Sequence, residues 1–332
     1  MKVIDLHTHV VPEHFPKYSG PAPDPGWPSM AHDGCGHAHV MISGKNFRTI
    51  GDVAWNTDKR ATDMESMGVT RQVLSPMPEL LSYWLPTSAA QPLLRHINEE
   101  IARTVAHDRS RFSGLGAVPL QDTDLAIREL EYLMGTLGLS GVEIAPNVNG
   151  VPIGDARFDA FFSAAERLGA AVFMHALRPA GKDRLIGPPL LEQVVAFPGE
   201  VGLGIASMMT GGMLERHADL RLAVSHGGGS FGLLLARMHD AWQKLTPMKE
   251  AMPQSPRHYA RQLYYDTCVF DPTVLKFLIE CFGDDRLIIG TDYPFGNHER
   301  DPLGLLERAG ISGQVLERLC HENAERFLKI DS

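Results

Sequence analysis

Two histidines one residue apart, His7 and His9, follow a short apolar run, VIDL, near the start of the chain. In a β-strand residues i and i+2 point to the same face, so a strand ending here would direct both imidazoles into one space. Other candidate ligands also stand at the ends of apolar runs: His175 ends AVFMH, His226 follows LRLAVS, and Asp292 follows RLIIGT. Three imidazoles and a carboxylate suit Zn²⁺ or another borderline divalent ion, with one position left for water or substrate. The sequence therefore predicts a metal centre assembled from strand ends.

Spacing alone does not identify such a site. His37 and His39 have the same spacing, but they lie in the glycine-rich stretch HDGCGHAHV, which no apolar run precedes. A second zinc site with Cys35 and His32 is conceivable, although no regular ligand spacing supports it. The candidate ligands of the metal centre differ from His37 and His39 because they stand at the ends of predicted strands.

The elements that must position these residues form a regular series. Short apolar and β-branched runs predict eight strands. They cover residues 3–6, 71–75, 112–118, 140–145, 171–175, 220–225, 263–267 and 286–290. Apolar residues at helical spacing lie between them, for example over 125–134 and 158–168. Strands alternating with helices pair in parallel, and eight of them close into a (β/α)8 TIM-like barrel. A doubly wound open sheet is the alternative, but no GxGxxG motif follows an early strand.

Two stretches exceed what a minimal barrel needs. Residues 16–52 form an inserted loop region after strand 1, and residues 178–215 form a long connection after strand 5. In a barrel both would lie on the C-terminal face, where substrates bind. No linker or internal repeat is evident, so we predict a single domain over residues 1–332, with the insert covering the active site.

Composition narrows the function classes. The 332 residues are 44% apolar and carry a formal net charge of −9 without a lysine- or arginine-rich block, which argues against nucleic-acid and membrane partners. The first apolar run is too short for a signal peptide, and no stretch approaches the roughly 18 apolar residues of a membrane helix, so we expect a cytoplasmic protein. Four scattered cysteines without a CxxC pair suggest neither disulfides nor a cysteine zinc site.

Several motifs occur in order along nearly the whole chain. They are DLHTH at 5–9, GKNFR at 44–48, VPLQD at 118–122, FMH at 173–175, SHGGGSF at 225–231, GTDYPF at 290–295 and NAERFL at 323–328. Together they resemble the metal-dependent decarboxylase branch of the amidohydrolase superfamily. The resemblance implies that His7, His9, His175 and Asp292 hold one divalent ion, zinc first and manganese as the alternative. It also implies that His226 is the acid/base beside the metal-bound water.

The resemblance also implies how substrate is held. Arg48 matches an arginine that binds a substrate carboxylate, for which a planar guanidinium is suited. Arg237 matches one that reaches the neighbouring subunit's site, which implies a homodimer. Lys45 is a weaker candidate for binding the same anion, and Phe295 is a candidate for the pocket wall. Many hydrolases of the superfamily carry a bridging lysine at the end of strand 4, but this chain has Glu143 in that strand, as in the mononuclear branch.

The implied activity is non-oxidative decarboxylation of a small carboxylic acid, either unsaturated, like an aminocarboxymuconate semialdehyde, or aromatic, like a hydroxybenzoate. Either the metal-bound water and His226 begin the reaction, or the substrate binds the metal and Asp292 protonates the ring carbon; the sequence leaves both routes open. A mononuclear hydrolase or hydratase is the alternative within the superfamily. A metal-binding scaffold without activity is the alternative from another class, but both acid/base residues, His226 and Asp292, are present.

One segment departs from the family pattern. After His175 the relatives continue with proline and tryptophan, whereas this chain has HALRPAGKDRLIGPPLLEQ. Arg178, with Lys182 and Arg184, would make this wall of the pocket more cationic. The substrate therefore depends on the segment 176–190.

Overall fold

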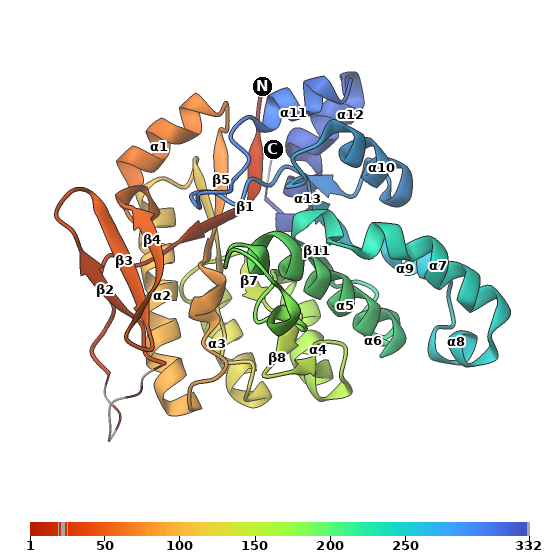
Figure 1. Cartoon of the computed structure of the whole chain (residues 1–332), viewed down its shortest axis with the longest axis horizontal. Coiled ribbons are helices and arrows are strands. Elements are labelled where there is room, and N and C mark those ends of the chain that lie inside the picture. Colours follow the sequence, from red (N-terminus) through yellow and green to blue (C-terminus); the bar gives the residue numbers. More distant parts are fainter. Residues whose placement is uncertain (19, 21–23, 25, 331–332) are drawn as a thin grey trace.

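Eight parallel strands form a barrel surrounded by helices in the computed structural model, which describes residues 1–18, 20, 24 and 26–330 (Figure 1). In their order around the barrel the strands are β1 (Ile4–Val10), β5 (Arg71–Pro76), β6 (Phe112–Gly116), β7 (Gly141–Ile144), β10 (Ala171–Met174), β11 (Arg221–Val224), β12 (Tyr264–Asp266) and β13 (Leu287–Ile288). The last strand returns to the first, because the Leu6 N–H donates to the Ile289 carbonyl at 2.8 Å. The predicted (β/α)8 barrel is confirmed. Each predicted strand segment overlaps one of these strands, although β1 continues beyond the prediction to Val10.

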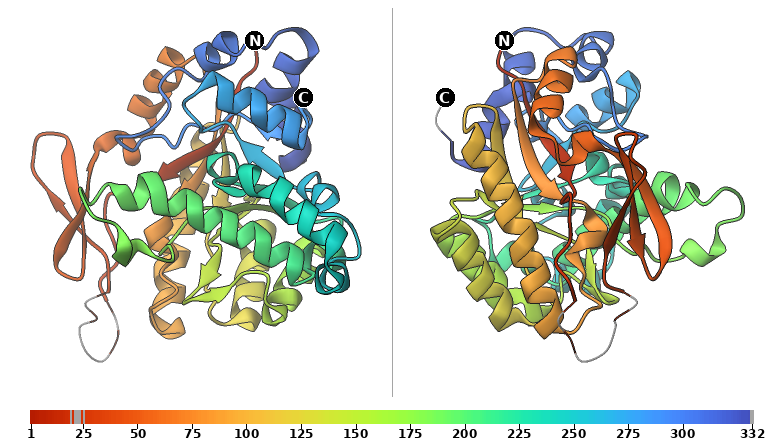
Figure 2. Two further views of the ribbon diagram at one scale, coloured as in Figure 1. Left: turned by 45° about the vertical axis from the view of Figure 1, so that its right-hand side comes forward. Right: turned by 90° about the vertical axis from the view of Figure 1, so that its left-hand side faces the viewer.

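Helices follow the strands and cover the outside of the barrel (Figure 2). The longer ones are α1 (Thr57–Ser66), α2 (Thr87–His107), α3 (Thr123–Gly135), α4 (Asp159–Leu168), α5 (Phe197–Thr210), α7 (Phe231–Lys244) and α10 (Pro272–Phe282). The shorter ones are α6 (Met213–Arg216), α8 (Thr246–Ala251), α9 (Pro256–Ala260), α11 (Pro302–Arg308), α12 (Gly313–Glu317) and α13 (Asn323–Leu328). Side-chain caps set where some helices begin: Asp122 accepts from the Leu125 N–H at α3, and Asp271 accepts from the Val274 N–H at α10.

The strands separate two hydrophobic cores. The larger core lies between the outer faces of the strands and the helices, and it includes Val172, Leu222 and Tyr265. The smaller core fills the barrel with side chains such as Leu6, Leu115 and Phe173, and α13 adds Phe327 to it. Burying apolar side chains on both faces explains why these strands read as continuous apolar runs in the sequence.

The long connection predicted over 178–215 is only partly irregular. Residues Phe197–Thr210 form α5, the crossover helix that follows β10. The helix has no clear polar face, because Val201, Gly204 and Ile205 among others are buried, and Gly202 and Gly204 interrupt its apolar pattern. The prediction of a long loop was therefore wrong over this part, because a helix that is apolar on its exposed side as well, as at Leu203, gives little amphipathic period.

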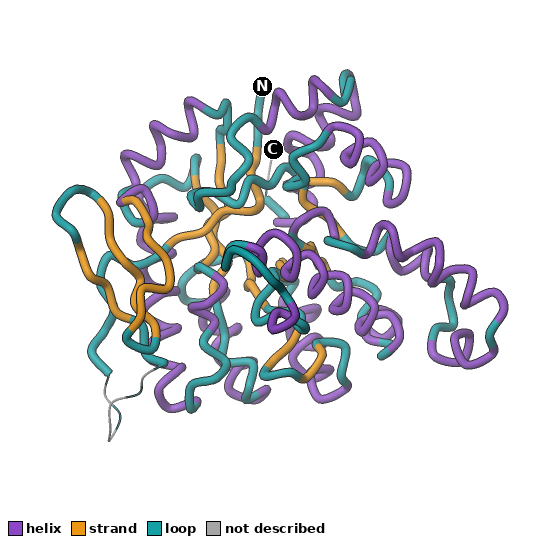
Figure 3. The backbone as a smooth tube through the Cα atoms, in the orientation of Figure 1, coloured by secondary structure: helices purple, strands orange, loops and turns teal. Residues whose placement is uncertain are grey.

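The inserted segment after β1 contains a three-stranded antiparallel sheet, β2 (Ser29–His32), β3 (His37–Ile42) and β4 (Lys45–Gly51), which stands beside the barrel (Figure 3). Along β3, Ala38 and Val40 are buried while His37 is exposed. His39 lies on the same side as His37, with its Nδ1 2.8 Å from the Thr49 hydroxyl. Within the predicted insert, residues 19, 21–23 and 25 lie outside the described residues, as do residues 331–332 of the predicted domain.

Among the helices of the described ranges, none combines the length and the apolar character that crossing a membrane requires.

Candidate metal centre

Four side chains meet at the end of the barrel where the strands finish. His7 and His9 belong to β1, His175 follows β10 directly, and Asp292 comes after β13. The three histidines are buried, and one ligand atom from each of the four residues lies within 4.8 Å of the others. The structure therefore brings together the four metal ligands that the sequence predicted.

Each of these imidazoles has its Nδ1 next to a hydrogen-bond acceptor. The pairs are His7 Nδ1 with Asp266 Oδ2 at 2.5 Å, His9 Nδ1 with the Pro76 carbonyl at 2.9 Å, and His175 Nδ1 with the Ala176 carbonyl at 2.9 Å. Because a carbonyl oxygen only accepts, Nδ1 of His9 and His175 carries the proton, which leaves each Nε2 with a free lone pair. Acceptors behind histidines orient and activate metal ligands in this way.

The free Nε2 atoms converge on one point. Nε2 of His7 lies 3.1 Å from Nε2 of His9, and Oδ1 of Asp292 lies 3.4 Å and 3.2 Å from them. Nε2 of His175 is buried and has no hydrogen-bond partner among the described residues. Imidazole nitrogens and a carboxylate oxygen packed this closely around one point fit a bound cation. The donor set of three imidazoles and one carboxylate fits a divalent ion.

The protonation states agree with this assignment. Burial lowers the pKa of His9 to about 4 and that of His175 well below its usual value, so both are neutral, as metal ligands must be. Burial opposes ionisation of Asp292, but His7 and His226 outweigh it and hold the Asp292 pKa well below its usual range. Burial would also lower the pKa of His7, yet the Asp292 and Asp266 carboxylates raise it to about 10. A cation bound at His7 therefore replaces a proton.

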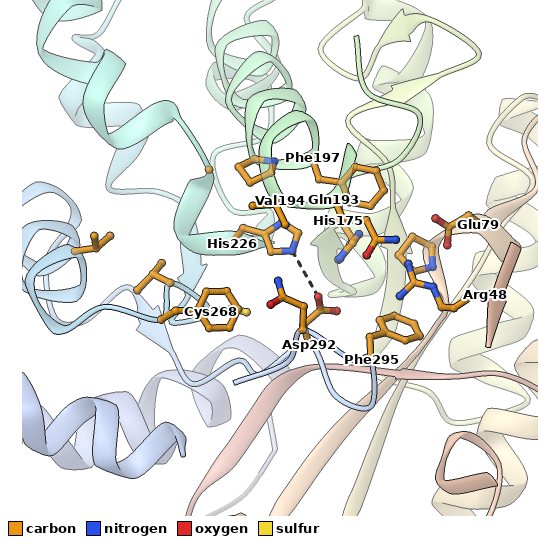
Figure 4. A pocket seen from close by; sticks show the side chains of 17 residues that line it. Arg48, Glu79, His175, Gln193, Val194, Phe197, His226, Cys268, Asp292 and Phe295 are labelled. Carbon is orange, nitrogen blue, oxygen red and sulfur yellow. Dashed lines mark ion pairs between the residues drawn. The ribbon is translucent and has the colours of Figure 1, made fainter. Parts of the chain in front are cut away.

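The loops that carry His226 and Asp292 hold unusual backbone conformations. His226 has φ +55° and Asp292 has φ +66°, a region that costs a residue other than glycine roughly 1–3 kcal/mol. Hydrogen bonds hold both in place: the His226 N–H donates to Asp266 Oδ2 at 2.9 Å, and the Asp292 N–H donates to the His7 carbonyl at 2.8 Å. The loop of His226 turns tightly through Gly227, Gly228 and Gly229, which also have positive φ. His226 Nε2 then lies 4.0 Å from Asp292 Oδ2 (Figure 4).

Sequence reasoning missed Asp266, which lies next to the end of the seventh predicted strand, 263–267, and is the last residue of β12. Its carboxylate binds Nδ1 of His7 and the backbone N–H groups of His226 and Gly227, so one buried side chain positions both a ligand and the candidate acid/base. A carboxylate at a strand end was the available signal.

Replacing Asp266 with asparagine is expected to weaken metal binding by about 10–100-fold, because the amide cannot match the charged hydrogen bond that orients His7. Competition with a chelating dye measures this affinity. Asp271→Asn is the matched control, since Asp271 is an exposed helix cap and asparagine caps equally well. Equal affinity in Asp266→Asn and wild-type protein would contradict the positioning role.

A cavity of about 400 Å³ opens beside the four ligands. Its wall includes Arg48, His226, Asp292 and Phe295 (Figure 4). The Phe295 ring stacks on His9 at 5.0 Å between centroids, and the Arg48 guanidinium lies 4.0 Å from the centre of that ring. Nε of Arg48 is buried without a partner among the described residues, so the guanidinium is available to a bound anion.

Two predicted substrate-binding residues are not on this wall. Lys45 follows the Ser43–Gly44 turn at the start of β4, and its side chain is exposed to solvent. The prediction that Lys45 holds the anion therefore receives no support from its position. Arg237 is exposed on α7 and does not line the cavity of its own chain.

The connection after β10 also differs from the prediction. Arg178 lies 3.5 Å over the Trp84 ring, away from the cavity wall, and Lys182 pairs with Glu192 at 3.3 Å. The connection contributes to the wall through later residues, namely Gln193, Val194 and Phe197. In an irregular segment, the position of a residue in the sequence does not indicate the direction of its side chain. For this reason the prediction that the basic residues line the pocket was wrong.

Comparison with known proteins agrees with this site. The family model described as Amidohydrolase matches residues 4–330. The chain is 37% identical to the 2-amino-3-carboxymuconate-6-semialdehyde decarboxylase of Dictyostelium discoideum, over 99% of this chain and 92% of that protein. It is 26% identical to the gamma-resorcylate decarboxylase of a Polaromonas species, over 82% and 87%. A dihydroxybenzoic acid decarboxylase structure from Polaromonas, with bound manganese and an inhibitor, has a TM-score of 0.77, with 23% identity over 99% and 97% of the two chains.

Proposed function

The chain belongs to the amidohydrolase family, and from this premise we propose that it is a metal-dependent carboxy-lyase that decarboxylates an aromatic or unsaturated carboxylic acid without oxidation. One observation carries the proposal: the four ligand atoms converge on the wall of a cavity that also holds His226 and Arg48. The decarboxylases similar to this chain over most of its length support the same class of reaction.

We propose one Zn²⁺ at this site, because neutral imidazoles dominate the donor set; Mn²⁺, which the related Polaromonas structure contains, is the alternative. When bound, a divalent ion polarises the oxygens of a substrate and lowers the pKa of a coordinated water towards about 7. Elemental analysis of the purified protein identifies the metal. His7, His9, His175 and Asp292 hold it in this proposal.

The residues of the cavity wall have separate roles in the proposed decarboxylation. Arg48 binds a carboxylate of the substrate through paired hydrogen bonds, and Phe295 gives the planar part of the molecule a flat surface. His226 faces the cavity and delivers a proton to the carbon that loses CO₂. His226 then regains its proton from water. In the second route Asp292, which the structure holds as a carboxylate, first takes up a proton from water and then delivers it to the ring carbon that loses CO₂.

Release of CO₂ tests the proposal directly. Purified metal-loaded protein is incubated with hydroxybenzoates and with carboxylated semialdehydes, and CO₂ is measured alongside the loss of substrate. We expect CO₂ in equal amount to the substrate consumed from at least one of these acids. Consumption of an acid, amide or lactone by addition of water without CO₂ would instead support the alternative, a mononuclear hydrolase or hydratase that uses the same metal site.

We further propose a homodimer in which Arg237 reaches the neighbouring active site. Arg237 is exposed on α7, and Leu233 (77%) and Leu234 (48%) of the same helix expose apolar surface that a second subunit would cover. All four cysteines are free, which fits the cytoplasmic location proposed from the sequence.

Mixing two inactive variants, Arg237→Ala and His175→Ala, is expected to restore part of the activity. In a hybrid dimer one site receives an intact metal centre from one subunit and an intact arginine from the other. Activity is measured after subunit exchange has been verified with differently tagged chains. Exchange without any recovery would show that Arg237 does not serve its neighbour's site.

A further inference from the structure

Glu79 lies on the cavity wall in a position that no other role accounts for. It belongs to the single helical turn η2 (Pro78–Leu81), which follows β5 and is buried at every residue. Pro78 opens the turn, and Ser82 with φ +51° closes it. The backbone of Glu79 is therefore fixed before any ligand enters.

One oxygen of the Glu79 carboxylate is buried without a hydrogen-bond partner among the described residues. The residue is 7% exposed, and its Oε2 accepts no hydrogen bond within the part of the chain that the structure describes. Burying a carboxylate without partners costs free energy, so an apolar residue would be more stable in this place. Burial raises the pKa of Glu79, and the charge of Arg48 only partly offsets this effect. An unsatisfied group of this kind on a cavity wall points to a ligand that satisfies it.

Arg48 is the neighbour that could pair with Glu79, but the two form no ion pair in the described structure. Nε of Arg48 and Oε2 of Glu79 are both buried and unpartnered, and both residues line the cavity, where Figure 4 draws them on the same side. The cavity wall therefore presents Arg48 as a hydrogen-bond donor to an anion. Close to it, Glu79 offers an oxygen that accepts a hydrogen bond from a ligand.

We propose that Glu79 is a specificity-determining residue that accepts a hydrogen bond from a hydroxyl or amino group of the substrate, while Arg48 binds a carboxylate of the same molecule. This inference rests on the proposed function, because it adds that the carboxylic acid substrate carries a hydroxyl or amino group that donates a hydrogen bond. Both the ionised and the protonated carboxyl group keep an oxygen that accepts. A site with a buried acceptor discriminates against analogues that lack the donor, because the acceptor then stays unpaired.

Equilibrium binding tests the inference without depending on turnover. Titration calorimetry on metal-loaded protein compares benzoate with its 2-, 3- and 4-hydroxy and amino derivatives. We expect wild-type protein to bind the best donor-bearing acid at least about 10-fold more tightly than benzoate. Glu79→Met, which keeps the length and removes the acceptor, should reduce this preference to about threefold or less and leave benzoate binding nearly unchanged. Glu79→Gln, which keeps an uncharged acceptor, should retain part of the preference.

Two controls separate the competing explanations. Arg48→Gln should weaken all the acids to a similar degree, because it removes the contact that they share. Metal content and melting temperature of both Glu79 variants show whether the site has folded. Any preference that a 2-hydroxy group owes to metal chelation persists in Glu79→Met, so it is distinguished from the Glu79 contact.

Three results would overturn the inference. The first is an unchanged preference in folded Glu79→Met protein. The second is equal weakening of benzoate and its derivatives in that variant, because Glu79 would then act only by positioning Arg48. The third is failure of every donor-bearing acid to bind the wild-type protein. If the preference behaves as expected while no acid releases CO₂, the decarboxylase proposal fails and the role of Glu79 stands.

Discussion

Replacing His175 with alanine is expected to remove the bound metal and to lower kcat/KM for decarboxylation by at least about 10³-fold, since a Lewis-acid ion supplies several kcal/mol of transition-state stabilisation. His175 is the most suitable ligand to replace, because its Nε2 has no hydrogen-bond partner among the described residues. Its loss therefore leaves the other contacts of the metal centre intact. The metal-to-protein ratio is measured after gel filtration, and activity is measured by CO₂ release. Chelation of wild-type protein should produce the same loss, and adding the metal back should reverse it.

His37→Ala is the matched control for this prediction. His37 belongs to a second pair with the same spacing, but its side chain is exposed on β3. The variant should retain metal and activity within about twofold, because substitutions at exposed positions away from the site have small effects. Full metal content in His175→Ala would contradict the ligand assignment, and loss of metal in His37→Ala would point to a second site.

Replacing His226 with asparagine is expected to lower kcat by about 10²–10⁴-fold while metal content stays at the wild-type level, because His226 handles a proton and does not complete the four-residue ligand set. Asparagine tolerates positive φ, so the backbone at φ +55° should persist. Steady-state kinetics on the metal-loaded variant measure the effect, with KM expected to change by less than about threefold if substrate binding depends mainly on Arg48.

His258→Asn provides the reference for this substitution, because His258 is exposed on α9 and does not line the cavity. Its activity should equal that of the wild-type protein. Two results would count against the acid/base role of His226: kcat within about threefold of wild type, or loss of the metal together with the activity. The second would identify His226 as a ligand, a possibility that the spacing of strand ends alone left open.

Much of the barrel could be predicted because its strands are buried on both faces. Ala171–Met174 is buried at every position and ends directly at His175, so one pattern located both a strand and a ligand. The helix α5 could not be predicted in the same way, because its exposed side also carries an apolar residue, Leu203, which weakens the polar face on which helical periodicity depends. The alternation along β3 was present in the sequence, but its glycine-rich flank made it read as loop.

Some residues of the metal centre could likewise be predicted from the sequence, and others could not. His7 and His9 share a face because strand geometry is local, and this relation follows from the sequence alone. Asp266, in contrast, lies 259 residues from His7 and binds its Nδ1 only because β12 and β1 end at the same face of the barrel. The orientation of His7 and His9, and therefore the convergence of their Nε2 atoms, depends on such distant acceptors, whereas His175 uses the carbonyl of the adjacent Ala176.

The sequence by itself determined the order of the barrel strands, the barrel and five candidate ligands, since each depends on burial and on residue types at strand ends. The resemblance to the family reduced the candidates to the four ligands by excluding His226. Only the tertiary structure decided which charged side chains face the cavity. It placed Arg48 and Glu79 on the wall and left Lys45, Arg178 and Arg237 off it. These side chains come from the small sheet of the insert, a single helical turn, an irregular connection and the exposed face of a helix, none of which follows the pattern of the barrel strands. Packing between segments far apart in the chain sets their direction instead, which is why the chemistry could be predicted before the substrate pocket.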